Sequence, residues 1–408
     1  MNFIPSAWRL PLGAIVVCGC LIGIISFGAR AGFGLFLTPI SQEFQWGREV
    51  FALSLAIQNL IWGLGQPFAG MLADKYGSGR VIAAGGVVYA LGVALMSYSS
   101  EPWQMHLTAG VLVGLGTSFA SFMIVMATLA RKVAPKWRSL VLGLATASGS
   151  IGQFTMVPLG QSFLKAYGWH TALLLIAAIV LLMIPLASTV TGKGAPTPGM
   201  RDQSVREAFG EAFAHRSYNL LVAGFFVCGF HVAFIMVHMP AYVVDRGLAP
   251  ETGAIALALV GAFNIIGSIT AGYVGGKFSK KYSLAAIYLA RSAAIALFVT
   301  LPISELTVYL FSAAMGLLWL STVPFTSGLV VQFFGLRYMG MLFGFVFLSH
   351  QVGSFLGVWL GGRLYDSYGT YDVVWWLGVA LGAAAALVHL PIREAPAPRL
   401  APAAAAAE

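Results

Sequence analysis

Two ionisable side chains stand at matching places inside long apolar runs of this sequence. Arg30 lies nine residues before Pro39, and His231 lies nine residues before Pro240. Burying an ionisable group in lipid costs at least about 2.5–3.5 kcal/mol, so such a residue indicates a functional site. An arginine offers a fork of N–H donors that fits a carboxylate, and a histidine exchanges a proton near neutral pH. We therefore predict that the two residues bind an anion and that His231 could carry a proton.

Three further residues complete the predicted substrate site. His350 stands in the polar triplet Ser349-His350-Gln351 and could donate to the anion or hold the coupled proton. Asn264 and Tyr89 are polar residues within apolar runs and could line a cavity. Plainer alternatives stay open for all of these residues. An arginine can bond to backbone carbonyls, a histidine can pack as a neutral group, and an amide or a hydroxyl can bridge two helices.

The charges of the apolar runs favour a negatively charged ligand. Two more cationic or titratable residues lie within runs. We interpret His238 as an interface residue, and for Arg291 both a structural role and a place in the cavity lining stay open. Acidic residues stand at run ends or in loops, including Glu101, Asp245, Glu251, Glu305, Asp366 and Asp372. A protein that binds organic cations in a membrane generally needs a buried carboxylate, and this sequence has none at mid-run. An anion could neutralise Arg30 where nothing else does.

The elements that must position these residues are membrane-spanning helices. Hydrophobic residues make up 59% of the chain and charged residues 9%, and the mean hydropathy is +0.84. These values exclude a soluble domain. The three cysteines, Cys18, Cys20 and Cys228, lie within apolar runs and suggest no metal or disulfide framework. Without a nucleophile–base pair or a metal cluster, we expect no enzyme, no cofactor and no metal.

Apolar runs of about 20 residues, the length that crosses the hydrocarbon of a bilayer, recur along the chain. They predict twelve spans: 13–38, 49–73, 80–99, 104–129, 139–164, 170–190, 218–242, 253–276, 283–301, 305–332, 339–362 and 373–391. The predicted fold is an all-α membrane protein with two six-helix bundles. Its domains would be 1–190, a cytoplasmic linker 191–216, a second bundle 217–394 and a disordered tail 395–408.

Basic residues fix the expected orientation. With the N-terminus in the cytoplasm, seventeen Lys and Arg residues fall inside, and only Arg48, Lys165, Arg246 and Arg363 fall outside. Because positive loops stay in the cytoplasm, both termini are expected there. The net charge of +9 thus reflects membrane orientation and gives no reason to expect nucleic-acid binding.

An internal repeat relates the two halves. The segments 69–76 and 271–278 align, as do Tyr167-Gly168 and Tyr368-Gly369, at offsets of 201 or 202 residues. Two like halves in the same orientation place a central site on the pseudo-twofold axis between them.

The loop after the second span carries the sequence Gly70-Met-Leu-Ala-Asp74-Lys-Tyr-Gly77-Ser-Gly-Arg80. Its glycines permit a tight reversal between helices, and Asp74 could bind a helix N-terminus or basic neighbours. This loop resembles the signature that follows the second helix in the major facilitator superfamily, and the resemblance in topology and repeat covers residues 10 to 392. It implies a conformational latch formed by Gly70, Asp74, Gly77 and Arg80. The second copy has Gly276 in place of Asp74, so the latch would belong to the first half.

A second motif, from Ala134-Pro-Lys-Trp-Arg138 through the glycine-rich stretch to Gly152, resembles the fifth helix of monocarboxylate porters and oxalate:formate-type exchangers. Its small residues would let this helix approach a neighbour closely. Two features of that branch are missing: an aspartate-glycine-glycine-tryptophan pattern at the first helix, and a substrate-binding arginine in the eighth, where this chain offers Asn264. Arg291 falls in the ninth span instead.

These observations predict a secondary active transporter of a small organic anion, a mono- or dicarboxylate, that is coupled to protons or works by exchange. The two halves would rock about the site so that it faces each side in turn. Alternatives are an exporter of neutral or amphiphilic drug-like compounds and a non-transporting membrane sensor. We expect a monomer in the lipid bilayer, in a bacterial inner membrane, with no nucleic-acid partner.

Overall fold

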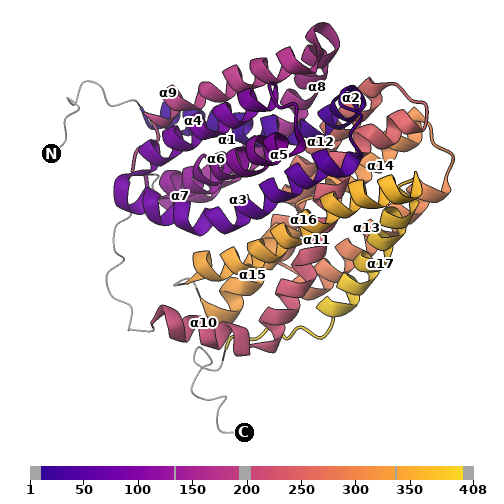
Figure 1. The fold of residues 1–408 in the computed structure, drawn as a ribbon. Coiled ribbons are helices and arrows are strands. Elements are labelled where there is room, and N and C mark those ends of the chain that lie inside the picture. Colours follow the sequence, from indigo (N-terminus) through magenta and orange to yellow (C-terminus); the bar gives the residue numbers. More distant parts are fainter. Residues whose placement is uncertain (1–10, 133–134, 193–203, 336–337, 398–408) are drawn as a thin grey trace, which may run out of the picture.

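The computed structural model describes residues 11–132, 135–192, 204–335 and 338–397. Within these ranges every regular element is a helix. The helices form the two predicted bundles, which Figure 1 shows with the first half in indigo to magenta and the second in salmon to yellow. The predicted fold class is confirmed. The domain boundaries stay a prediction, because much of the predicted linker and tail lies outside the described residues.

The first half contains eleven elements in the described residues. They are α1 (Leu12–Ala31), η2 (Phe33–Phe36), α2 (Leu37–Glu43), α3 (Arg48–Tyr76), α4 (Ser78–Met96), α5 (Pro102–Met105), η3 (His106–Leu112), α6 (Val113–Phe119), α7 (Phe122–Lys132), α8 (Pro135–Leu181) and α9 (Met183–Ala187).

The second half has eight described helices. They are α10 (Val205–Ala214), α11 (Arg216–Asp245), α12 (Pro250–Gly275), α13 (Lys280–Thr300), α14 (Glu305–Leu318), α15 (Thr322–Phe334), α16 (Met339–Tyr368) and α17 (Asp372–His389).

Ten helical stretches of the described residues are long and apolar enough to cross a membrane. One of them, in α8, contains two spans, because Gly168 breaks the helix with a φ of +74° that an L side chain rarely adopts. Helix α3, with 29 residues, is long enough to cross as well. The count therefore agrees with a twelve-span architecture.

The close approach of α1 and α8 explains the small residues of the second motif. A Cβ atom on Gly28 would lie 2.6 Å from the backbone oxygen of Gly152, and one on Gly152 would collide with the backbone of Ile24. In lipid, where the hydrophobic effect does not drive helix association, such backbone contact is a main source of packing energy. The glycines thus fix the position of α1, the helix that carries Arg30.

One span in each half is broken at mid-height. The first break, at Ala120 and Ser121, separates α6 from α7, and the second, from Trp319 to Ser321, separates α14 from α15. Helix α15 begins 200 residues after α7, so the breaks are related by the internal repeat. A broken helix at membrane depth leaves backbone groups that need partners from the protein or from a ligand.

We call the end of the bundle at which α1 begins the N-terminal face and the opposite end the distal face. Helices α3, α12 and α17 begin at the distal face, and α11 and α16 end there.

Candidate functional site

The Arg30 side chain lies between α1 and α3. Its Nη2 donates a hydrogen bond to Asn59 Oδ1, and its guanidinium carbon lies 4.6 Å from the centre of the Trp62 ring. The Nε atom is buried and has no hydrogen-bond partner. Asn59 is held in turn by its own Nδ2, which donates to Leu55 O at 2.8 Å. The arginine is thus positioned by an amide and an indole and keeps a free donor.

Arg30 borders a small cavity at the break between α6 and α7. The cavity has a volume of about 10 Å³ and is lined by Ser26, Phe27, Arg30, Trp62, Thr117 and Ser121. That volume holds about one water-sized group. Ser26 Oγ donates to Ala120 O at 3.1 Å, so a hydroxyl from α1 satisfies the freed carbonyl of the break. Helix α7, whose N-terminus carries partial positive charge, begins directly after Ser121.

The charge of Arg30 has no acidic partner in the described part of the chain. The ion pairs found there use Arg48, Lys165, His170, Arg246 and Arg363, which all lie at the distal face. A buried cation normally requires an anion, because desolvation of an unpaired charge costs several kcal/mol. The unpaired charge of Arg30 therefore favours a negatively charged partner.

His350 is connected to this cavity by two aromatic rings. The ring centre of Trp62 lies 5.3 Å from that of Phe347, which stacks on His350 at 5.7 Å. His350 Nδ1 lies 3.1 Å from Gln351 Oε1 and 3.5 Å from Ser354 Oγ. The histidine thus belongs to the second half but reaches the Arg30 cavity of the first half through packed side chains.

His231 occupies a different environment. Its Nε2 lies 2.8 Å from Gly378 O of α17, and its Nδ1 is buried without a partner. Gly382 leaves room for the imidazole between α11 and α17, because a Cβ atom there would lie 3.0 Å from the ring. The structure does not bring His231 next to Arg30, although the two residues are equivalent in the repeat.

Asn264 and Tyr89 are both buried and engaged. Asn264 Nδ2 donates to Ser150 Oγ of the other half at 2.8 Å, and its Oδ1 accepts from Leu320 N at 3.0 Å. Tyr89, with no exposed surface, donates from its hydroxyl to Ser26 O at 3.2 Å. Asn264 therefore joins the break of the second half to α8, whereas Tyr89 positions the α1 turn that carries Ser26.

Arg291 is fully buried, and the second break takes up two of its nitrogens, whereas its Nη1 is buried without a hydrogen-bond partner. Its Nε and Nη2 donate to Leu318 O at 3.2 and 2.6 Å, and Nη2 also donates to Trp319 O. The residue closes the gap between α14 and α15, as a structural role requires.

The predicted latch loop reverses the chain at the N-terminal face. Gly77 adopts a φ of +99° between α3 and α4, Gly70 has open space beside its Cα atom, and Arg80 is exposed. Ser78 N donates to Gly192 O at 2.9 Å, which anchors the loop to the end of the sixth span. The side chain of Asp74 lies outside the described part of the structure, so the latch stays a prediction.

A polar cluster that the sequence did not predict joins the two halves at the distal face. Arg48 of α3 makes two hydrogen bonds of 2.6 Å to the carboxylate of Asp245, donates to Tyr371 Oη at 2.9 Å and stacks on Tyr365 at 3.8 Å. We call these four residues the Arg48 cluster. One sequence signal was available: Arg48 is one of few cations on the side where positive charge is disfavoured.

Additional contacts extend this closure. The backbone N–H groups of Arg48 and Glu49 donate to the carboxylate of Asp366, and Glu49 also accepts from Trp359 Nε1 at 2.9 Å and pairs with Arg363 at 3.0 Å. The start of α3 is thus bound to the distal end of α16.

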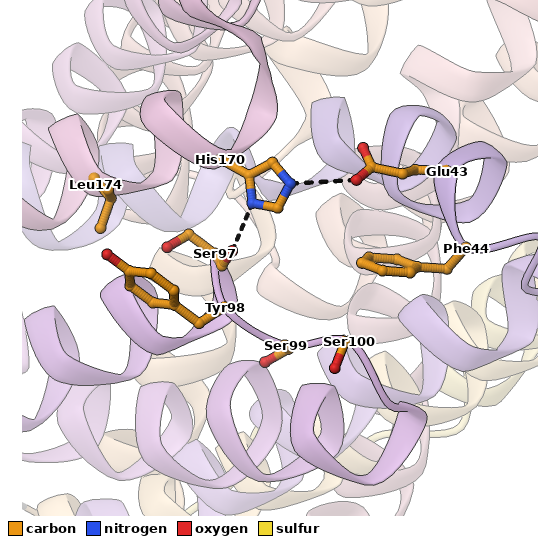
Figure 2. A pocket seen from close by; sticks show the side chains of 8 residues that line it. All are labelled: Glu43, Phe44, Ser97, Tyr98, Ser99, Ser100, His170 and Leu174. Carbon is orange, nitrogen blue, oxygen red and sulfur yellow. Dashed lines mark hydrogen bonds and ion pairs between the residues drawn. The ribbon is translucent and has the colours of Figure 1, made fainter.

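A larger cavity, of about 310 Å³, opens at the distal face of the first half (Figure 2). His170 lies between Ser97 O, at 2.6 Å from its Nδ1, and Glu43, at 3.3 Å from its Nε2. Because its polar groups bind one another, the cavity offers few free donors or acceptors. We assign it to the packing of α2 against α8.

The family model described as Major Facilitator Superfamily matches residues 19–357. Among curated relatives, the uncharacterized MFS-type transporter YcxA of Bacillus subtilis (strain 168) is 25% identical over 85% of this chain and 86% of its own length. Monocarboxylate transporter 13 of Rattus norvegicus is 26% identical over 92% and 88%, and monocarboxylate transporter 4 of the same species is 26% identical over 94% and 82%.

Among solved structures, a bacterial homologue of the human lysosomal transporter Spinster in an inward-facing, unoccupied conformation superimposes with a TM-score of 0.75. The match covers 94% of this chain and 98% of the other at 14% sequence identity. At that identity the likeness concerns the fold.

Proposed function

Because the chain belongs to the Major Facilitator Superfamily and is a multi-pass membrane transporter, we propose that it carries a small organic anion, a mono- or dicarboxylate, and that Arg30 binds the carboxylate. One observation carries the proposal: a cation at membrane depth has no acidic partner in the described residues and keeps a buried Nε donor free. The names of the monocarboxylate transporters among its relatives support the same substrate class.

The surroundings of Arg30 suit a carboxylate in three ways. The guanidinium can make two parallel hydrogen bonds, which gives geometric specificity. The positive end of α7 adds a favourable field at the same cavity. Trp62 keeps the guanidinium in place and shields one of its faces from water, so the ionic interaction is stronger than it would be in solution. Release of the anion leaves the charge of Arg30 without a partner. This favours either exchange for a second anion or coupling of release to a proton.

The coupling belongs to the proposal as well. We assign the coupled proton to His350, which is connected to the Arg30 cavity through Trp62 and Phe347. His231 packs against α17, so a proton on His231 would lie farther from the substrate.

We also propose that both termini are cytoplasmic, which makes the distal face the outer face, in agreement with seventeen basic residues inside and four outside. The halves would rock about their mid-height contacts, where Asn264 bonds to Ser150 and Gln153 Nε2 donates to Leu257 O at 2.9 Å. In this conformation the Arg48 cluster holds the outer end closed.

Counterflow in proteoliposomes tests the proposal. Liposomes loaded with an unlabelled carboxylate should take up the labelled compound through the parent protein. Arg30→Ala should abolish this uptake, Arg30→Lys should retain part of it, and Arg206→Ala, an exposed arginine of α10, should leave it unchanged. Uptake of neutral amphiphiles but of no carboxylate would support the exporter alternative, and undiminished carboxylate uptake by Arg30→Ala would remove Arg30 from the site.

A further inference from the structure

His238 of α11 lies behind the Arg48 cluster and is bonded to it. It is fully buried, its Nε2 lies 2.8 Å from Val358 O, and its Nδ1 lies 3.1 Å from Tyr371 Oη. The same hydroxyl accepts a hydrogen bond from Arg48. A chain of hydrogen bonds therefore runs from Asp245 through Arg48 and Tyr371 to His238. This chain crosses from the second half to the first and back.

The partners determine which imidazole nitrogen carries the proton. Val358 O can only accept, so His238 Nε2 must be the donor there. Tyr371 Oη accepts from Arg48, and its own proton can then bond only to a free lone pair on His238 Nδ1. The closed cluster therefore contains a neutral His238 that is protonated on Nε2.

A second proton on His238 conflicts with this arrangement. Nδ1–H would take the place of the phenol proton between the imidazole and Tyr371, so the phenol proton would lose its bond to His238. It would also place two cations on one hydroxyl. The charged and titratable groups around this network are Arg48 of α3, Asp245 and Tyr242 of α11, Tyr365 and Asp366 of α16, and Tyr371 of α17. Asp245 and Asp366 are already bound to α3, so neither carboxylate is available to the imidazolium.

We propose that His238 is the positioning residue through which outside pH controls the distal gate of this transporter. Neutral His238 holds Tyr371 in the orientation that clamps Arg48 to Asp245, and protonation releases the clamp and lets the halves separate at the distal face. The inference builds on the proposed transport function and orientation but assigns no contact between His238 and the substrate.

The groups packed around His238 fit its imidazole closely. A Cβ atom on Gly361 would collide with the imidazole, so α16 is shaped to admit this ring. Phe234 covers it from its own helix at 5.5 Å between ring centres. The imidazole therefore has little freedom to turn away from Tyr371 when it gains a proton.

Cysteine labelling tests the gate without any substrate. Ala52 is buried at the distal end of α3 against Gly362 of the other half. In a background with the native cysteines replaced by alanine, Ala52→Cys should react with a membrane-impermeant maleimide only when the distal face opens. Rates are measured at about pH 5.5 and about pH 8, which bracket the titration of an imidazole that is open to water, as His238 would be once the gate has opened. They are divided by the rates of Ser100→Cys, which is exposed at the same face and corrects for thiol ionisation.

The normalised rate of the parent should rise about tenfold on acidification, as expected if the gate loses ~1.4 kcal/mol. His238→Gln keeps an acceptor for Tyr371 and a donor for Val358 O but cannot titrate, so its rate should stay at the value for pH 8. Tyr371→Phe, which removes the link, should give a high rate at both pH values. An acid response in His238→Gln equal to that of the parent overturns the proposal, as does a parent without any response. If labelling behaves as expected but no carboxylate is transported, the proposed substrate fails and the gate stands.

Discussion

Two arginines lie at membrane depth in this protein, and the backbone around each explains its different role. At the break of the second half, Arg291 itself satisfies the freed carbonyls. At the equivalent break of the first half, the hydroxyl of Ser26 does so, and Arg30 is left with an unused donor. Each arginine keeps one buried nitrogen without a partner, but Arg30 borders a cavity, whereas Arg291 joins the two ends of the second break.

Trp62 should matter for substrate affinity. A cation over an indole face gains about 0.5–2 kcal/mol, so Trp62→Leu should raise the KM for the transported anion about 2- to 30-fold, and Trp62→Phe should raise it less. Initial rates of uptake measure the change. Thermal unfolding of both variants serves as the control, because Trp62 also packs against Phe347. An unchanged KM in Trp62→Leu would contradict the assigned contact.

Sequence reasoning identified Arg30 but only part of its surroundings. An arginine in an apolar run is visible in one dimension, whereas the indole 4.6 Å away belongs to another helix and is one of many aromatic residues. Arg30 and His231 stand 201 residues apart, at matching places of the repeat, yet Gly382 makes room for the histidine on the α17 side. Repeat position predicts depth in the membrane but not the neighbour that a side chain faces.

At the scale of elements, glycines decide how closely helices approach. Gly28→Val should separate α1 from α8, because the added atoms would overlap the backbone at Gly152. Overpacking of this kind typically costs about 1–3 kcal/mol, and it should lower the thermal stability in detergent and displace Arg30. Gly149→Ala, on the α8 side of the same helix pair, is the control, since its Cβ would make ordinary contact at 3.6 Å with Phe27. Equal melting temperatures for the two variants would contradict the close approach.

The broken helices could not be predicted from composition. Pro324 lies in α15, beyond the second break, and the first break contains only Ala120 and Ser121, which are compatible with a helix. Both breaks depend on partners from other helices, Ser26 in one half and Arg291 in the other. Tertiary contacts outweigh local propensity here. The spans, the orientation and the repeat, by contrast, follow from hydropathy and charge. The spans and the repeat agree with the fold.

At the scale of the whole molecule, the distal closure is uneven. On the α3 side, Arg48 makes a bidentate ion pair and stacks on tyrosine. On the α8 side, the exposed pair Lys165–Glu251 borders a cavity of about 370 Å³. Exposed ion pairs contribute about 0.2–1 kcal/mol at most, so the Arg48 cluster should dominate the equilibrium between closed and open distal ends.

Two single substitutions test this asymmetry. Arg48→Ala should increase the reaction of Ala52→Cys with an impermeant maleimide by at least about tenfold, because a hydrogen bond to a charged group contributes about 1.5–3 kcal/mol. Lys165→Ala should change the same rate less than about fivefold. Comparable effects of the two variants would show that closure does not depend on the Arg48 cluster.

The first turn of α3 has no cap of its own, because Gly47 provides no side chain at the position where a serine or aspartate would bind the free amides. Asp366 of the opposite half performs this task, with bonds of 2.9 and 2.8 Å to the amides of Arg48 and Glu49. Each transport cycle that parts the distal ends must therefore uncap α3 and let its first turn fray. Deuterium uptake at these two amides would then report, in unlabelled protein, how often the distal face opens.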